Sequence, residues 1–135
     1  MNLWLPIGIL ALTTVFGLYW RSQQGKLKVP AQIHNFISKD EIGIELGSRV
    51  TIIQFCSAFC SPCKATAQII STLVRDMDDV KFGQIKSEEN LKLVEKFDIK
   101  STPTVIFFNS LAMEVGRAVG IPTNQQVLAS IAAVR

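Results

Sequence analysis

Residues 50–64 read VTIIQFCSAFCSPCK, and they carry the strongest structural signal in the chain. Its first part, Val50–Cys56, is an apolar run rich in β-branched residues, which predicts a buried strand. Two cysteines then follow with two residues between them, Cys60 and Cys63, and residues 61–77 have the apolar periodicity of a helix. The stretch therefore predicts a strand that leads through a dithiol directly into a helix.

The dithiol lies where a helix favours a thiolate. Cys60 falls at the start of the predicted helix, where unpaired backbone N–H groups and the helix dipole stabilise negative charge. The thiolate is the nucleophile, and cysteines at such sites have a pKa lowered from ~8.5 to roughly 3.5–7.5. Pro62 suits the first turn because the N–H that it lacks has no partner there. Cys63 follows one turn later, close enough to attack a mixed disulfide on Cys60.

Outward from this stretch, strand and helix signals alternate. Strands are predicted at residues 50–56, 80–85, 104–108 and 113–119. Helices are predicted at residues 35–46, 61–77, 88–97 and 123–134, the last with Thr123 as its N-cap. This order predicts an α/β fold in which helices cover a mixed central sheet.

Two segments resemble the thioredoxin family. Residues 53–64, IQFCSAFCSPCK, are similar to the active-site segment of thioredoxins, and residues 100–108, KSTPTVIFF, resemble the family's cis-proline segment before a central strand. Val119-Gly120 is a weaker match to a glycine at the rim of the family's substrate groove. The likeness covers about residues 30–135. It implies a thioredoxin-like fold and a protein-disulfide oxidoreductase that acts in cell redox homeostasis.

The resemblance also implies roles for individual residues. Cys60 is expected to be the attacking thiol and Cys63 the resolving thiol. Pro103 is expected to be cis and to pack against the dithiol, while the Thr102 backbone pairs with an extended substrate and Gly120 admits the substrate backbone. The implied substrate groove contains Phe59, Pro62, Thr102, Pro103 and Gly120. The redox-active disulfide of Cys60 and Cys63 is the only redox group expected, and the expected partners are a protein disulfide or dithiol and a reductant.

The chain departs from the thioredoxin pattern on the strand before the dithiol. The family usually carries a buried Asp there, two residues before a Trp, and these positions hold Gln54 and Cys56. The family's Lys on the next strand falls on Gln84. Loss of both charges avoids leaving one buried charge unpaired, but it removes the group that takes the proton from the resolving thiol. We therefore predict that Cys63 deprotonates less readily than in ordinary thioredoxins and that general reductase turnover is slower.

Cys56 adds a third thiol near the dithiol. The resulting C-x₃-C-x₂-C spacing is also that of the radical-SAM iron–sulfur motif, but this chain is too short for the barrel of that family. A metal site built from all three thiols lacks a fourth ligand nearby, since His34 is the only His and belongs to another element. The favoured interpretation of Cys56 is a small buried hydrophobe, with a regulatory thiol as the alternative. No metal is expected.

Residues 3–20 contain no charge over 18 residues, which is about the minimum for crossing a bilayer. Aromatic residues that favour the membrane interface stand near both ends: Trp4, Tyr19 and Trp20. A cleavable signal peptide fits less well, because no Lys or Arg precedes the run and no small-x-small site follows it. A buried helix fits poorly because a domain of this size can hardly cover one that is apolar on all faces. The prediction is a transmembrane anchor at 1–20, a linker at 21–30 and a thioredoxin-like domain at 31–135.

The charge distribution predicts the orientation of the anchor. The net charge is +3, and three basic residues, Arg21, Lys26 and Lys28, follow the apolar run, so the other 11 basic residues balance the 11 acidic ones. The excess is local, and no nucleic-acid binding is expected. The positive-inside rule places the domain on the cytoplasmic face of the membrane, where reduction is the natural direction of exchange.

These features favour a membrane-tethered thiol–disulfide oxidoreductase. Two other functions fit the same sequence. One is an extracytoplasmic reductase that serves cytochrome or metal-centre assembly. The other is a non-catalytic thioredoxin-like module that binds a metal or a partner.

Overall fold

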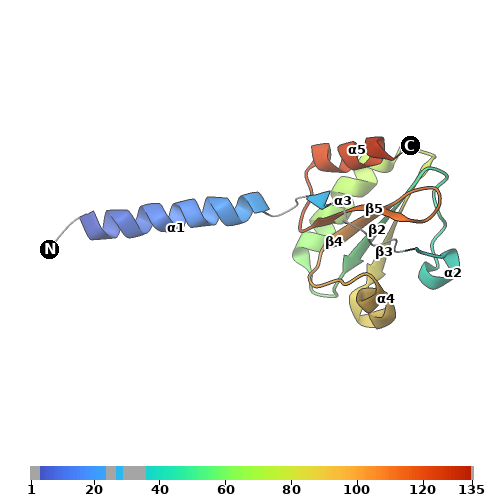
Figure 1. Cartoon of the computed structure of the whole chain (residues 1–135), viewed down its shortest axis with the longest axis horizontal. Helices are drawn as coiled ribbons and strands as arrows, with labels where there is room; N and C mark the ends of the chain where they lie inside the picture. The colour runs from blue at the N-terminus through green and yellow to red at the C-terminus, as the bar shows by residue number, and fades with distance from the viewer. Residues whose placement is uncertain (1–3, 24–26, 29–35, 135) are drawn as a thin grey trace.

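The structure, a computed structural model, describes residues 4–23, 27–28 and 36–134. Figure 1 shows an α/β domain from which helix α1 (Trp4–Gln23) extends as an arm. His34, the residue weighed above as a possible metal ligand, lies outside the described residues.

The domain contains a five-stranded sheet in the order β1-β5-β4-β2-β3. Strands β2 and β3 are parallel, whereas β2 with β4, β4 with β5, and β5 with β1 are antiparallel. The mixed sheet and the thioredoxin-like α/β class that the sequence predicted are therefore confirmed. The elements in chain order are β1 (Leu27–Lys28), α2 (Lys39–Ile42), β2 (Val50–Cys56), α3 (Ser61–Val74), β3 (Val80–Lys86), η1 (Ser87–Glu89), α4 (Leu91–Lys96), β4 (Thr104–Phe108), β5 (Glu114–Val119) and α5 (Asn124–Ala133).

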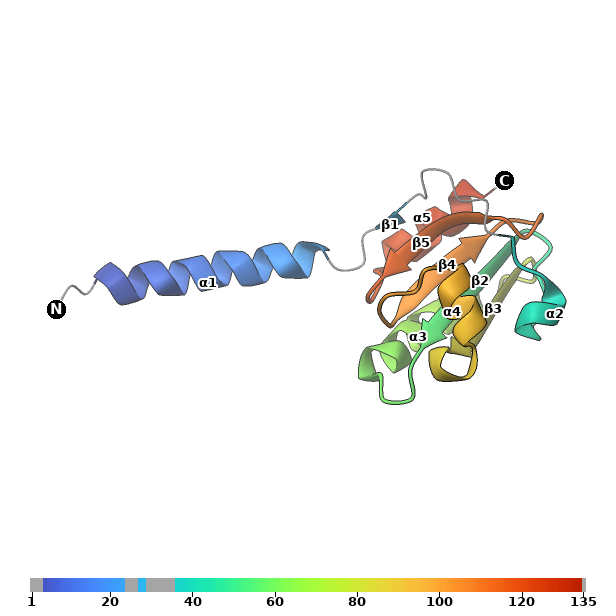
Figure 2. The same ribbon diagram turned by 60° about the horizontal axis from the view of Figure 1, so that its bottom comes forward.

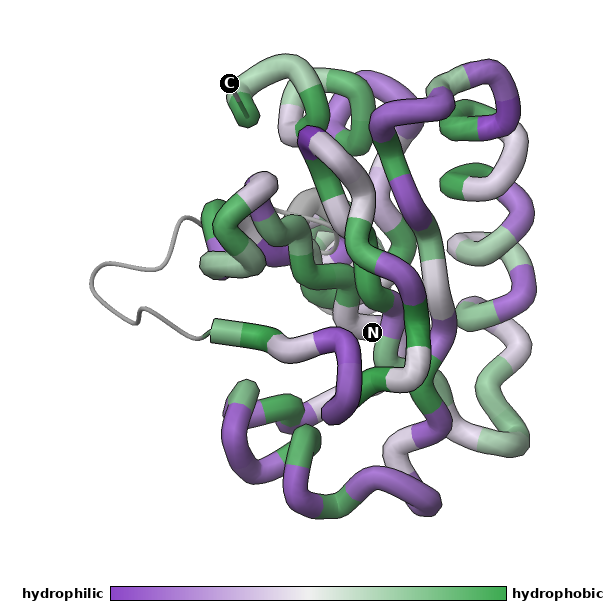
Figure 3. The backbone as a smooth tube through the Cα atoms, turned by 90° about the vertical axis from the view of Figure 1, so that its right-hand side faces the viewer, coloured by the Kyte–Doolittle hydropathy of each residue, from purple (hydrophilic) through white to green (hydrophobic). Residues whose placement is uncertain are grey.

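The sheet separates two hydrophobic cores, because successive strand residues point to opposite faces. Ile52 of β2 packs with Ile70 of α3 and Ile131 of α5 on one face. Phe55 of β2 packs with Phe97, at the end of α4, on the other face. Figures 1 and 2 show α5 and α4 on opposite sides of the strands, and Figure 3 shows hydrophobic residues gathered along the central strands. Strand β2, which leads to the dithiol, is thus buried on both sides.

The predicted helices differ from the structure at their ends. The helix expected at residues 35–46 is only the short α2, which Ser38 caps and Gly43 ends with a φ of 62°. The helix expected at 88–97 is divided into η1 and α4. The helix expected at 61–77 ends at Val74, whereas Thr123 caps α5 as predicted.

The N-terminal segment contains more regular structure than the sequence predicted. Helix α1 continues to Gln23, and β1 pairs with β5, although residues 21–30 were expected to be a linker. The large apolar side chains of α1 are exposed on every face, from Phe16 at 58% to Trp4 at 86%. Within the described ranges, no helix combines the length and the apolar character that a membrane crossing requires. The transmembrane assignment of residues 3–20 stays a prediction.

Candidate active site

Cys60 and Cys63 form a disulfide at the start of α3. Cys60 is the N-cap residue with extended backbone angles, and Pro62 lies in the first turn, as the sequence predicted. The two sulfurs differ in their access to solvent. Cys60 is half-buried, whereas Cys63 is buried, with 5% of its surface exposed. A partner can therefore reach the disulfide from the Cys60 side.

The first turn of α3 provides an electropositive setting for Cys60. No side chain caps the helix, and no acidic residue lies in its first turn. The positive end of the helix dipole therefore lies at Cys60, where it stabilises a thiolate once the disulfide is reduced.

The cis-proline loop lies at the same end of the sheet as the disulfide. The Thr102–Pro103 peptide bond is cis, as the sequence predicted, and Pro103 is buried. The hydroxyl groups of Ser57 and Thr102 are 3.3 Å apart and connect the loop before Cys60 with this loop. Gly120, with a φ of 86°, donates its backbone N–H to the Pro103 carbonyl over 2.8 Å.

An exposed apolar rim surrounds these loops. Phe59 is 99% exposed beside Cys60, and Pro62 is also exposed. Val119 and Ile121, on either side of Gly120, are 36% and 42% exposed. Ile121 was not among the predicted site residues, because a single apolar residue after a strand has no sequence signal that distinguishes it from core.

Glu88 also contacts the loop that carries Cys60. The backbone N–H of Ala58 donates to its carboxylate over 2.8 Å, and this bond holds the pKa of Glu88 below its usual range. Glu88 lies in η1, which follows β3. The contact spans 30 positions, so no local pattern could reveal it.

Gln54 lies directly behind the disulfide and is fully buried. Its Nε2 donates to the backbone carbonyl of Cys63 over 2.8 Å. Gln84 pairs with Gln54 in register but, unlike Gln54, is exposed. The reason is its place on β3, the edge strand of the sheet.

Cys56 is a free, buried thiol. Its Sγ donates to the Ile85 carbonyl over 3.5 Å. Burial raises the pKa of Cys56, and repulsion from Glu88 raises it further. These properties fit the predicted small buried hydrophobe. In the part of the chain that the structure describes, no three His, Cys, Asp or Glu side chains form a potential metal site.

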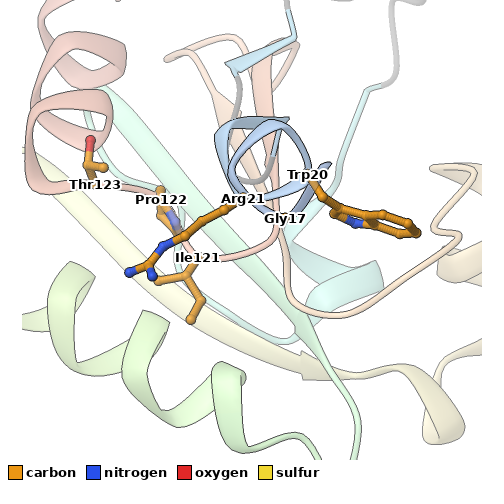
Figure 4. Close-up of a pocket in the computed structure, with 6 residues that line it drawn as sticks. All are labelled: Gly17, Trp20, Arg21, Ile121, Pro122 and Thr123. Carbon is orange, nitrogen blue, oxygen red and sulfur yellow. The ribbon is translucent and has the colours of Figure 1, made fainter. Parts of the chain in front are cut away.

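A cleft of about 660 Å³ lies between the end of α1 and the segment after Gly120. Figure 4 shows that Arg21 extends toward Ile121, whereas Trp20 points to the other side of α1. The arm therefore ends close to the rim of the candidate site. The cleft is lined by Gly17, Trp20, Arg21, Ile121, Pro122 and Thr123.

Comparisons with known proteins agree with this geometry. The thioredoxin family model matches residues 35–133. Thioredoxin of Chlamydia pneumoniae is 31% identical over 85 residues, which cover 63% of this chain and 82% of that protein. Thioredoxin-2 of Saccharomyces cerevisiae is 28% identical over 83 residues, covering 62% and 79%.

Solved thioredoxin structures share the fold. Fasciola hepatica thioredoxin matches with a TM-score of 0.58 and 21% identity, covering 66% of this chain and 84% of that one. Nicotiana alata thioredoxin matches with the same TM-score and 24% identity, covering 65% and 75%. Sequence and fold thus agree over nearly the whole domain, and the chain belongs to the thioredoxin family of thiol–disulfide oxidoreductases.

Proposed function

We propose that this chain is a membrane-tethered oxidoreductase that exchanges disulfides with a dedicated protein partner through Cys60. The observation that carries the proposal is the asymmetry of the disulfide. Cys60 is accessible beside the exposed Phe59, whereas Cys63 is buried behind it. Such a pair allows one sulfur to meet a substrate and the other to wait until the mixed disulfide has formed.

The exchange begins with the reduced protein. The Cys60 thiolate attacks one sulfur of a substrate disulfide, so that a new S–S bond forms as the substrate bond breaks, and the departing substrate thiolate takes a proton from water. Cys63 then loses its proton and attacks Cys60. The second substrate thiolate leaves and is protonated, and the Cys60–Cys63 disulfide is restored. A dithiol reductant returns two electrons and two protons to the protein.

The substrate is proposed to bind as an extended segment across the cis-proline loop. The Thr102 backbone pairs with it, Gly120 lets its backbone approach, and Phe59 with Pro62 packs against its side chains. The exposure of Phe59 supports this arrangement, because an aromatic side chain that is 99% exposed contributes almost nothing to the core.

A dedicated partner is proposed because the buried acid of ordinary thioredoxins is replaced by Gln54. An amide cannot accept the proton of Cys63, so resolution depends on the thiol's own ionisation. Slow resolution of the mixed disulfide on Cys60 is compatible with a partner that stays bound. It is a disadvantage for a reductase that serves many substrates.

The tether is proposed to be residues 3–20, with the domain on the cytoplasmic face. The support is the uncharged sequence and the exposure of the apolar side chains described on α1. Figure 1 shows that the helix itself extends away from the domain. Membrane fractions of cells that express the full chain should retain it after washes with high salt and alkaline carbonate. Recovery of the full chain in the soluble fraction would contradict the tether.

The decisive experiment is trapping in membranes with the full-length Cys63→Ser variant. One dominant mixed disulfide that dithiothreitol releases is expected, since Cys63 is no longer present to resolve it. The matched control is the Cys60→Ser, Cys63→Ser double variant, which should trap nothing. Absence of any Cys60-dependent adduct, or an adduct that the control also forms, would refute exchange through Cys60.

A reporter fused after Arg135 tests the orientation. An active cytoplasmic reporter is the expected result. A reporter that is active only on the other side would reverse the proposed orientation and favour an extracytoplasmic reductase for cytochrome or metal-centre assembly.

A further inference from the structure

The buried side of the disulfide contains an acceptor that the oxidised protein does not use. Gln54 is fully buried, and its Oε1 has no hydrogen-bond partner among the described residues. Buried side-chain oxygens are nearly always paired, because an unpaired one loses its bonds to water without compensation. This oxygen therefore requires an explanation in terms of what the molecule does.

The orientation of the Gln54 amide is set by its neighbour. Nε2 lies 2.8 Å from the backbone oxygen of Cys63, and a carbonyl oxygen can only accept a hydrogen bond. The NH₂ group must therefore face that carbonyl. Oε1 is therefore turned away from that carbonyl, and a rotation of the amide that exchanged the two atoms would place two oxygens together.

Reduction creates a new donor on Cys63, the residue that the Gln54 amide already contacts. In the disulfide, the Cys63 sulfur carries no hydrogen. When a dithiol reductant delivers two electrons and two protons, the S–S bond breaks and Cys63 becomes a thiol. Its side chain is only 5% exposed, so water is a poor partner for the new S–H group.

We propose that Gln54 is a positioning residue whose Oε1 accepts the S–H of Cys63 in the reduced protein. The amide then holds Cys63 from two sides, through its backbone carbonyl and its thiol. A hydrogen bond from the neutral form keeps the proton on the sulfur. Cys63 accordingly stays a thiol until a substrate occupies Cys60, and the mixed disulfide lives longer. The inference rests on the proposed exchange through Cys60 and Cys63.

Thr66 is the rival acceptor. Its hydroxyl is also fully buried and unpaired in the described structure, and it lies one helical turn after Cys63 on α3. The two candidate acceptors can be tested separately, because each residue has an apolar replacement of similar size. Thr66→Val keeps the shape of the side chain, and Gln54→Leu removes the amide.

The test is the infrared S–H stretching band of reduced, full-length protein in a Cys56→Ala background, where Cys60 and Cys63 carry the two remaining thiols. Loss of the band in Cys63→Ser assigns it to that residue. Gln54→Leu should move the Cys63 band to higher frequency, because the S–H loses its acceptor, whereas Thr66→Val should leave it in place. The equilibrium with glutathione should also shift about threefold to fivefold toward the disulfide in Gln54→Leu, since the reduced form loses a weak hydrogen bond.

Thermal unfolding verifies that each variant is folded, and Gln54→Met, which keeps the length of the side chain, replaces Gln54→Leu if the latter does not fold. An unchanged Cys63 band in the folded variant would overturn the proposal, as would a shift produced by Thr66→Val. Trapping through Cys60 does not depend on this band, so failure of the inference is distinguishable from failure of the proposed exchange.

Discussion

Replacement of Gln54 by Asp tests why this member of the family carries an amide behind its disulfide. The wild-type side chain is fully buried and donates to Cys63 over 2.8 Å. Asp loses that bond, which costs about 1 kcal/mol, and it is shorter by one methylene, which costs about 1 kcal/mol more. A loss of about 2 kcal/mol lowers the Tm of a domain of this size by roughly 10 °C.

The same change should accelerate catalysis. The carboxylate can take the proton of Cys63, and positioned general bases contribute at least about 10²-fold when proton transfer limits the rate. We expect the resolution of a mixed disulfide on Cys60 to become at least tenfold faster. The assays are insulin reduction and single-turnover release of a substrate that was first coupled to Cys60. The rate in Gln54→Asp should rise with pH as the new carboxyl group ionises.

Gln84→Asp is the matched control, because Gln84 is the register partner of Gln54 but is exposed. It should change neither the rate nor the Tm appreciably. If wild-type insulin reduction equals that of an ordinary thioredoxin and Gln54→Asp alters no rate, then Gln54 does not limit resolution and the explanation given for the amide is wrong.

Three further predictions concern side chains around the disulfide. Phe59→Ala should raise the KM for a protein substrate severalfold and leave the Tm within about 2 °C of wild type. The control Phe55→Ala, at a fully buried position, should lower the free energy of unfolding by about 3–5 kcal/mol. An unchanged KM in Phe59→Ala would exclude Phe59 from the substrate site. Glu88→Ala should speed hydrogen exchange of the Ala58 amide, which loses its acceptor. Because the Ala58 bond lowers the pKa of Glu88, protection of this amide in the wild type should persist at neutral pH and fall only as acid protonates the carboxylate. Equal exchange rates in the two proteins would argue against the contact. Native Cys56 should react with iodoacetamide only at a higher pH than a free cysteine needs, since burial raises its pKa. Rapid labelling of Cys56 at neutral pH would contradict its burial.

The sequence was sufficient for the parts of the site that lie close together along the chain. Val50–Cys56 is mostly apolar because both faces of β2 are covered, and such a run is visible without an alignment. The dithiol and the helix that follows it are likewise one continuous pattern. The cis state of Pro103 came from the likeness to thioredoxins, since a Thr-Pro-Thr tripeptide alone does not determine the isomer.

Contacts between distant segments were not predictable in the same way. The bond between Ala58 and Glu88 depends on where η1 places one carboxylate after the chain leaves β3. The exposure of Gln84 depends on β3 being the outer strand, which is a property of the sheet order and not of the strand's own residues. The short α2 shows a further limit, because apolar spacing predicted a helix over residues 35–46, whereas the Ser38 cap and Gly43 confine it to Lys39–Ile42.

The exchange of a buried acid for an amide and the loss of its basic companion belong together physically. Gln84 is exposed in this chain, so a Lys there would be solvated and could offer a buried Asp only weak compensation. Burial would raise the pKa of an uncompensated Asp at position 54, so its ionisation would cost stability and it would act as a base only at higher pH. An amide avoids this cost and fixes the first turn of α3 through Cys63. These contacts are consistent with the proposed slow resolution of the mixed disulfide and with the proposed dedicated partner.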